Sequence, residues 1–229
     1  MSESRIRPAE GWRTEYPGAM IGALALEGVV NPAQDAALDS RASDLETELR
    51  QRFAGVPRAE IADMPYVKPF VEYYRKFGKT YHLLLQLESV VAKGRTLRGP
   101  NALVQAMFLA EMKSMLLTAG HDLRAVGGSA VVDVAAGTET YTTLADKPVT
   151  LKAGDMFIRD DLGVISSILY GPDQRTRITA ETRGVIYLVY APPGLVRVDL
   201  ERHLDDLETN TRVFAPHAER PLREILLAS

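Results

Sequence analysis

A histidine and an aspartate stand side by side in the stretch TAGHDL, at His121 and Asp122. A histidine held by a carboxylate can act as a general base, so this pair is the first candidate for proton-transfer chemistry. Direct neighbours on a helix or strand point apart, however, which seldom brings a base and its orienting partner together. Cationic side chains are also common in the last turn of a helix, near the free carbonyl groups. The residues alone therefore favour a histidine at a helix end over a catalytic pair.

The carboxylate in AAGTETYTTL (135–144) is the second candidate. Glu139 follows Gly137 and Thr138, and a glutamate presented after a sharp turn could contact an amine or a hydroxyl group of a ligand. The alternative is an exposed hairpin of strand-forming residues, which the pattern alone favours. The acidic stretch IRDD (158–161) indicates a turn between two strands.

Other signatures of catalysis do not occur in the sequence. The chain has no cysteine, which removes thiol nucleophiles and thiolate metal sites. The motifs GxGxxG, GxxxxGKS/T, HExxH and GxSxG are missing, and the four histidines are scattered over positions 82, 121, 203 and 217. We therefore expect no cofactor and no metal ion, and we assign no residue a catalytic role.

The charge of the chain is unevenly distributed. A net charge of −3 argues against indiscriminate nucleic-acid binding, because phosphate contacts come from lysines and arginines in numbers. The interval from Lys68 to Arg124 nevertheless holds nine basic and four acidic residues, a local charge of +5. This interval is the natural place to look for contacts to an anionic partner.

The sequence shows no targeting or membrane segment. The start, MSESRIRPAEGWRTEYPG, lacks the apolar core of a secretion signal. No later stretch reaches the roughly 18 uninterrupted apolar residues that a membrane helix requires. We expect a cytoplasmic protein with no membrane partner.

The hydrophobic periodicity predicts a helical first half. An early buried strand is expected at 19–30, and Asn31 and Pro32 have the residue types of a helix N-cap and a first helical position. Four helices are predicted, over 31–53, 64–77, 82–93 and 101–117.

From Ala130 onward the pattern changes to short strands separated by glycine, proline and aspartate. A polar helix over 195–214 and a short tail helix over 220–228 close the chain. This order of elements predicts an α+β fold in one domain, 1–229. The predicted strands are AVVDVAAG, TETYTTL, PVTL, DMFIRDD, GVISSILYG, RTRIT and GVIYLVYA.

Five short motifs follow one another in a characteristic order. They are Y-R-x-F-G at Tyr74, Arg75, Phe77 and Gly78, N-x-L-V at Asn101, Leu103 and Val104, D-L at Asp122 and Leu123, A-x-G-x-E at Ala135, Gly137 and Glu139, and an aspartate at Asp160 or Asp161. Together they resemble the B3/B4 domain of the bacterial phenylalanine-tRNA ligase beta chain, in particular its free-standing members. The resemblance covers about 16–192 and includes none of the ligase core.

The resemblance implies a layered fold, with N-terminal helices packed on a C-terminal sheet core of the β-sandwich type and a helical extension at 195–229. It implies recognition of tRNA or aminoacyl-tRNA, and editing by hydrolysis of a mischarged ester, for which a positioned water and oxyanion donors can suffice. Under it, the residues that bind the substrate are Glu139, Thr138, Gly137, Asn101, His121 and Asp122. The residues that meet RNA phosphates are Arg75, Lys76, Lys79, Arg95 and Arg98.

The chain also departs from the family pattern. Ala119 stands where the editing motif has a histidine, and His121 stands where the family has an aromatic residue. Gln105 replaces an aspartate, and a serine is replaced near Gln86. These departures keep a second reading open, in which the protein is a non-catalytic binding module for RNA or for an amino-acid-like small molecule.

Overall fold

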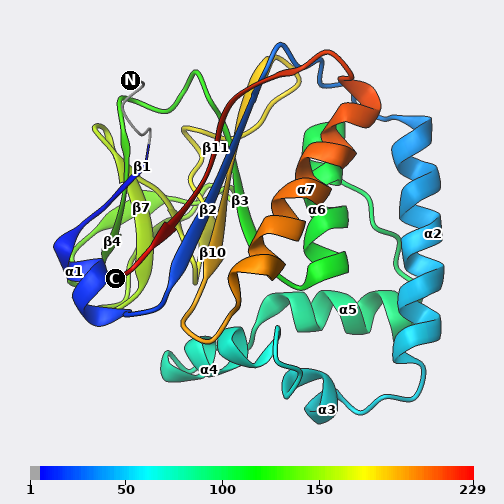
Figure 1. Ribbon diagram of the computed structural model, residues 1–229, viewed down its shortest axis with the longest axis horizontal. Coiled ribbons are helices and arrows are strands. Elements are labelled where there is room, and N and C mark those ends of the chain that lie inside the picture. The colour runs from blue at the N-terminus through cyan, green and yellow to red at the C-terminus, as the bar shows by residue number, and fades with distance from the viewer. Residues whose placement is uncertain (1–5) are drawn as a thin grey trace.

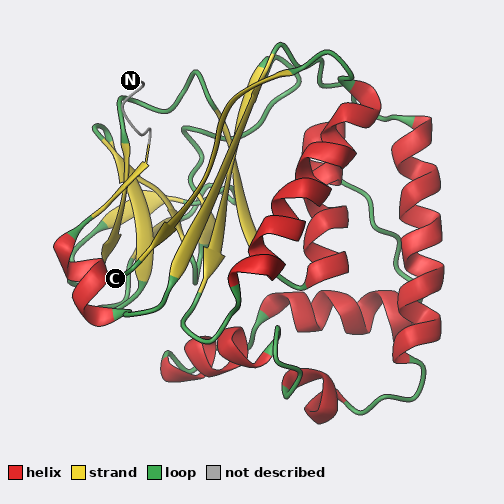
Figure 2. Cartoon of the chain, viewed as in Figure 1, coloured by secondary structure: helices red, strands yellow, loops and turns green. Residues whose placement is uncertain are grey.

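The computed structural model describes residues 6–229, in which the strands gather on one side and most helices on the other (Figure 1). A four-stranded sheet lies between a second sheet and the helices, and Figure 2 shows this separation of strand and helix layers. The architecture confirms the predicted α+β class. No helix among the described residues is long and apolar enough to cross a membrane.

The four-stranded sheet is antiparallel and has the order β11-β2-β10-β3. Its two central strands pair along their full length and are apolar and almost completely buried, because other layers cover both faces of the sheet. The strands are β2 (Met20–Glu27), β3 (Leu117–Asp122), β10 (Gly184–Ala191) and β11 (Glu219–Leu227).

The second sheet has five strands in the order β1-β4-β7-β8-β9, with β1 parallel to β4 and the other pairs antiparallel. A separate two-stranded ribbon, β5 (Thr140–Thr142) and β6 (Pro148–Thr150), lies between β4 and β7 in the chain. The five strands are β1 (Ile6–Pro8), β4 (Ala130–Val134), β7 (Met156–Asp160), β8 (Gly163–Ser167) and β9 (Gly171–Pro172).

Helices α6 and α7 pack against each other and against the four-stranded sheet, and α2 covers them on the outside (Figure 1). The close approach of α7 to β2 depends on Gly22, since a β-carbon there would lie 3.1 Å from Leu200 and 3.3 Å from Leu204. The helices are α1 (Glu10–Glu15), α2 (Ala36–Phe53), α3 (Arg58–Ala62), α4 (Lys68–Lys76), α5 (His82–Lys93), α6 (Ala102–Ser114) and α7 (Arg197–Phe214).

Most of the predicted elements are confirmed. The early strand is β2, the helix predicted over 82–93 is α5, and the polar helix near the C-terminus is α7. The helix predicted over 101–117 is α6, which ends at Ser114 because Met115 adopts a left-handed conformation with φ of 59°.

Four sequence predictions about elements are wrong. The predicted tail helix at 220–228 is the edge strand β11, and RTRIT (175–179) is irregular chain rather than a strand. The helix predicted over 64–77 begins only at Lys68. Helix α2 begins at Ala36, because Asp35 accepts the N–H groups of the first turn while the Asn31 amide bridges Thr179 and Leu103 instead.

A truncation on α7 tests its attachment to the sheet. Leu204 is fully buried against Gly22, so Leu204→Ala is expected to lower the free energy of unfolding by about 2–5 kcal/mol. Val198→Ala, at a position on the same helix that is 44% exposed, is the control and is expected to change it by less than about 0.5 kcal/mol. Urea unfolding followed by circular dichroism measures both; equal losses would contradict the packing of α7 on β2.

Candidate ligand pocket

A cavity of about 380 Å³ lies where α5, α6 and β3 meet the segment that runs from β8 to Ile178. Most of its wall is apolar, and Leu144 joins it from the turn between β5 and β6. Its apolar side chains include Val104, Met107, Phe108, Leu117, Leu144 and Ile178, and its polar side chains are His82, Gln86, Glu111, Thr118, Ser167, Arg177 and Tyr190. A cavity of this size and character suits a small organic group.

Glycine at position 120 helps keep this cavity open. A β-carbon at Gly120 would lie 2.9 Å from Ile178 Cδ1 and 3.1 Å from Met107 Sδ. Both contacts are closer than side-chain carbons normally tolerate, so a larger residue would force the wall to shift.

Glu111 is the one acidic side chain on the cavity wall and is only 3% exposed. Its Oε1 accepts a hydrogen bond of 2.7 Å from the backbone N–H of Thr118. Burial raises the pKa of this carboxyl to about 8, although that hydrogen bond lowers it in part. Glu111 is therefore mainly protonated at neutral pH, and none of the ion pairs among residues 6–229 includes it.

Behind Glu111, a buried histidine connects three elements. Thr118 Oγ1 lies 2.6 Å from His203 Nε2, and Ser114 Oγ lies 2.7 Å from His203 Nδ1. Burial lowers the pKa of His203 to about 3, so its ring is neutral at neutral pH. Each ring nitrogen has a hydroxyl partner. His203 thus ties α7 to β3 and to the end of α6, and it holds Thr118 against the cavity.

His82 stands on the cavity wall at the start of α5. Its Nδ1 lies 3.2 Å from the hydroxyl of Tyr74, which itself donates to the carbonyl of Ile168. Burial lowers the pKa of His82 to about 4, so the ring is neutral at neutral pH and is a weak base.

The structure places His121 in strand β3, so its predicted position at a helix end is wrong. The Thr176 hydroxyl donates to Asp173, so His121 Nδ1 must carry the proton of the 2.7 Å bond to Thr176 Oγ1. Nε2 is then an unprotonated acceptor, buried without a partner. Burial is the main cause that lowers the pKa of His121 to about 3.

Asp122 points away from His121, as neighbours on a strand must. Its carboxylate accepts the Thr182 hydroxyl at 2.7 Å and the Arg124 N–H at 2.9 Å. The two residues therefore have separate structural partners and do not form a base with its orienting carboxylate.

Glu139 closes its own turn. Its carboxylate oxygens accept backbone N–H groups of Ala136, Gly137 and Thr138, each at 3.1 Å. Burial raises the pKa of Glu139, but these donors outweigh it and hold the pKa below its ordinary value. The prediction of a turn at IRDD is mostly wrong, because Ile158, Arg159 and Asp160 belong to strand β7 and only Asp161 lies in the turn to β8. Asp160 accepts two hydrogen bonds from Arg175, of 2.9 and 3.0 Å.

None of the six residues predicted to bind substrate lines the cavity. Asn101 is the N-cap of α6, where its Oδ1 accepts the Val104 N–H at 3.1 Å, and it stands next to Pro100 on the wall. Likewise His121 follows Gly120. Only Asn101 and His121 among the predicted substrate residues thus adjoin the cavity wall in sequence. The wall residues Glu111, Thr118 and Arg177 were not predicted, although a glutamate inside the apolar run MFLAEM was an available signal.

The five predicted RNA contacts lie on two segments near α5. Arg75 and Lys76 end α4, and Lys79 lies with its Nζ 4.4 Å above the ring of Tyr170, next to Gly171 of the cavity wall. Arg95 and Arg98 are exposed in the segment that leads to Pro100. Lys79 is three residues before His82 of the cavity wall, and Arg95 and Arg98 are five and two residues before Pro100.

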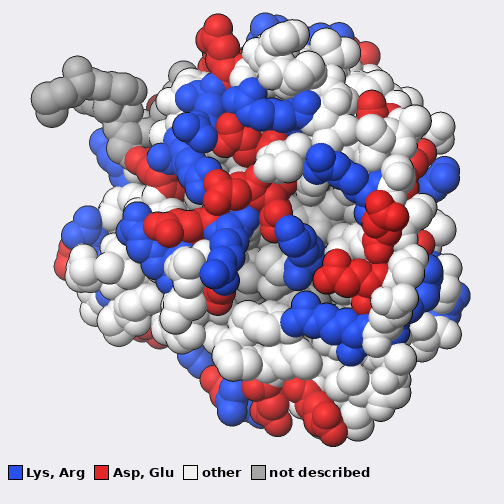
Figure 3. Space-filling view, turned by 45° about the vertical axis from the view of Figure 1, so that its right-hand side comes forward, with Lys and Arg blue, Asp and Glu red and all other residues white. Residues whose placement is uncertain are grey.

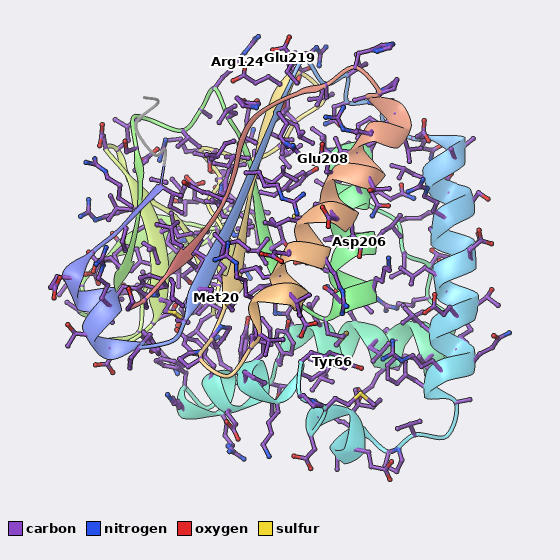
Figure 4. All side chains as sticks on the ribbon, viewed as in Figure 1. Met20, Tyr66, Arg124, Asp206, Glu208 and Glu219 are labelled. Atoms are coloured by element: carbon purple, nitrogen blue, oxygen red, sulfur yellow. The ribbon has the colours of Figure 1, made fainter. Side chains whose placement is uncertain are left out.

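Another face of the molecule has a mixed charge. Figure 3 shows basic and acidic side chains intermingled there rather than gathered by sign. Pairs between β11 and α7, such as Arg220 with Glu208 at 2.7 Å, are of this kind, and Figure 4 shows Asp206 and Glu208 on α7. Such neutralised pairs make a poor surface for a polyanion.

Among known proteins, no family model matches the chain, and no curated protein matches it in sequence. A solved structure, an N-terminal fragment of the phenylalanyl-tRNA synthetase beta-subunit from Pyrococcus horikoshii, is similar with a TM-score of 0.51 and 12% sequence identity. The two chains share a fold. The likeness covers 96% of this chain and 55% of that fragment, so this chain spans about half the length of its structural relative.

Replacement of Glu111 tests its protonation. In the unfolded chain this carboxyl ionises above about pH 4.5, whereas in the folded protein it stays protonated up to about pH 8. Glu111 therefore withdraws stability as the pH rises between these values, by up to about 1.4 kcal/mol per pH unit. Glu111→Gln cannot ionise, so its stability relative to the native protein is expected to increase from pH 5 to pH 8.

Chemical denaturation at several pH values measures this difference. Glu88→Gln is the matched control, because Glu88 is partly exposed and lies 3.2 Å from Arg58. The difference in free energy of unfolding between Glu88→Gln and the native protein should stay about the same at each pH. A pH-independent difference for Glu111→Gln would contradict a protonated Glu111.

Proposed function

We propose that the protein recognises aminoacyl-tRNA and holds the aminoacyl group in the cavity beside Glu111. The observation that carries the proposal is this cavity of about 380 Å³, within the range of pockets for small organic ligands. The shared fold with a fragment of a phenylalanyl-tRNA synthetase subunit supports a tRNA-related role.

Cationic side chains around the cavity support an anionic partner. Arg177 is an exposed residue of the wall, Lys79 lies beside Tyr170, and Arg95 and Arg98 precede Pro100. Under the proposal these residues meet the phosphates of the tRNA, together with Arg75 and Lys76 at the end of α4. Of the predicted substrate contacts, Asn101 and His121 adjoin the wall residues Pro100 and Gly120 in sequence, whereas Glu139, Thr138, Gly137 and Asp122 are not part of the wall and have no role in this proposal.

We propose binding in preference to hydrolysis of the ester. His82, with a pKa of about 4, is a weak base, and Glu111, with a pKa of about 8, retains its proton at neutral pH. His82 is therefore poorly matched to the activation of water near pH 7, and Glu111 is mainly in its protonated form there, which cannot accept a proton. Editing of a mischarged ester therefore stands as the second candidate, and the loss of ester from bound aminoacyl-tRNA is the measurement that would favour it.

Charge reversal near the cavity tests the tRNA contact. The double variant Arg95→Glu, Arg98→Glu is expected to bind tRNA about tenfold or more weakly at about 0.1 M salt, because each lost phosphate contact removes released counterions. It should also reduce the slope of affinity against salt by about one to two units. Arg13→Glu, at an exposed position on α1, is the control and should change little.

Filter binding or fluorescence anisotropy across a salt series provides the affinities. The same mixtures, sampled over time for intact ester, measure any hydrolysis. Equal binding by both charge-reversed proteins would contradict the proposed surface. A thermal-shift screen with free amino acids covers the alternative ligand class, an amino-acid-like small molecule without RNA.

A further inference from the structure

Glu111 is a buried acid that forms no ion pair among the described residues. One carboxylate oxygen is fixed by the Thr118 N–H, and Thr118 is itself held by His203. Glu111 is also part of the wall of the largely apolar cavity. An ionised carboxylate in such a place is costly unless a cation pairs with it, and the described ion pairs leave Glu111 without one.

We propose that the ligand supplies this missing charge, so that Glu111 is the counter-ion of a protonated amine. The inference rests on the proposed function in one respect, since the amine of an aminoacyl-tRNA would be the α-ammonium group of the aminoacyl ester. For any ligand of the cavity, the chemical class is an apolar body that carries an ammonium group.

The other charged group of the wall gives the ligand a direction. Arg177 repels an ammonium group and attracts a phosphate or carbonyl oxygen, whereas Glu111 does the reverse. The amine is therefore expected at Glu111 and the ester or phosphate end at Arg177. Burial strengthens the interaction at Glu111 relative to water, whereas Arg177 is exposed and its interaction is screened by solvent.

Binding of an ammonium group should change the protonation of Glu111. In the empty cavity the carboxyl holds a proton at pH 7, and an adjacent cation favours its ionised form. An amine that stays charged on both sides of the equilibrium therefore displaces up to about one proton from Glu111 to solvent. The amine keeps its own protons, so the released proton comes from the protein.

The groups near Glu111 do not mask this proton. Burial lowers the pKa of the histidines and raises the pKa of the tyrosines, so all of them stay neutral between pH 6 and 9. Asp155, whose pKa burial raises to about 7, does titrate in this range and interacts with Tyr73 and with Ser167 of the wall, so only the proton release that Glu111→Gln abolishes is assigned to Glu111. The neighbouring groups are His82, His203, Tyr74, Tyr81 and Tyr190, with Arg177 on the wall and Lys113, paired with Asp206, on the outer side of α6.

Calorimetry with two small probes tests the counter-ion directly. The probes are 2-phenylethylamine, an apolar body with an ammonium group, and its N-acetyl derivative, which is neutral. At pH 7, in two buffers of different ionisation enthalpy, the amine should bind the native protein at least tenfold more tightly than the amide and release about one proton. Glu111→Gln should remove both the preference and the proton release, whereas the control Glu88→Gln should retain them.

Equal binding of the two probes by the native protein, or binding of the amine without proton release, would overturn the proposal. This comparison needs no variant, so it decides the question even if Glu111→Gln does not fold. The tRNA forms separate the two proposals. If aminoacyl-tRNA and N-acetyl-aminoacyl-tRNA bind equally well, the counter-ion is refuted and tRNA recognition stands. If only the small amine binds, with proton release, the counter-ion stands and tRNA recognition fails.

Discussion

The central strands β2 and β10 are buried on both faces, and this constraint governs the rest of the molecule. One face requires the helices α6 and α7, and the other requires the second sheet. Every polar side chain that enters these layers must therefore be neutral or hydrogen-bonded, since water is excluded. Gly22 and Gly120 serve the same constraint, because they let neighbouring layers approach β2 and β3 closely.

The buried histidines illustrate how the layers accommodate polar groups. His203 satisfies both ring nitrogens with hydroxyl groups, and His121 satisfies one through Thr176. Both rings are neutral because burial opposes their charge. Glu111 follows the same rule in the free protein, but it lies at a cavity and can therefore meet a charge that arrives from outside.

The sequence predicted the fold better than the site. Helix α5 carries its own periodicity and a glycine stop at Gly94, so local residues sufficed to locate it. Strand β11 was predicted as a helix because its partner β2 is distant in sequence and its charged residues hid the alternation that is typical of a strand. Its Pro221 lies at a register shift, where the edge of a sheet tolerates a proline. The carboxylate predicted from the motifs, Glu139, caps a turn. The sequence marks Glu111 only as a glutamate in an apolar run, and its place on a cavity wall requires β3 and α5 to meet there. A site formed by segments that are distant in sequence leaves little trace in any one of them.

The pairing of β11 with β2 also has a consequence for the order of assembly. Leu227 pairs with Met20, so strand β2 cannot acquire this neighbour until nearly all the residues between them have been synthesised. Until then β2 carries an open edge of unpaired amide and carbonyl groups, which can template pairing with another chain. Contacts between residues so distant in sequence also slow folding, because the entropy of closing a long loop is lost before the contacts form. The growing chain is therefore most exposed to aggregation before β11 is in place.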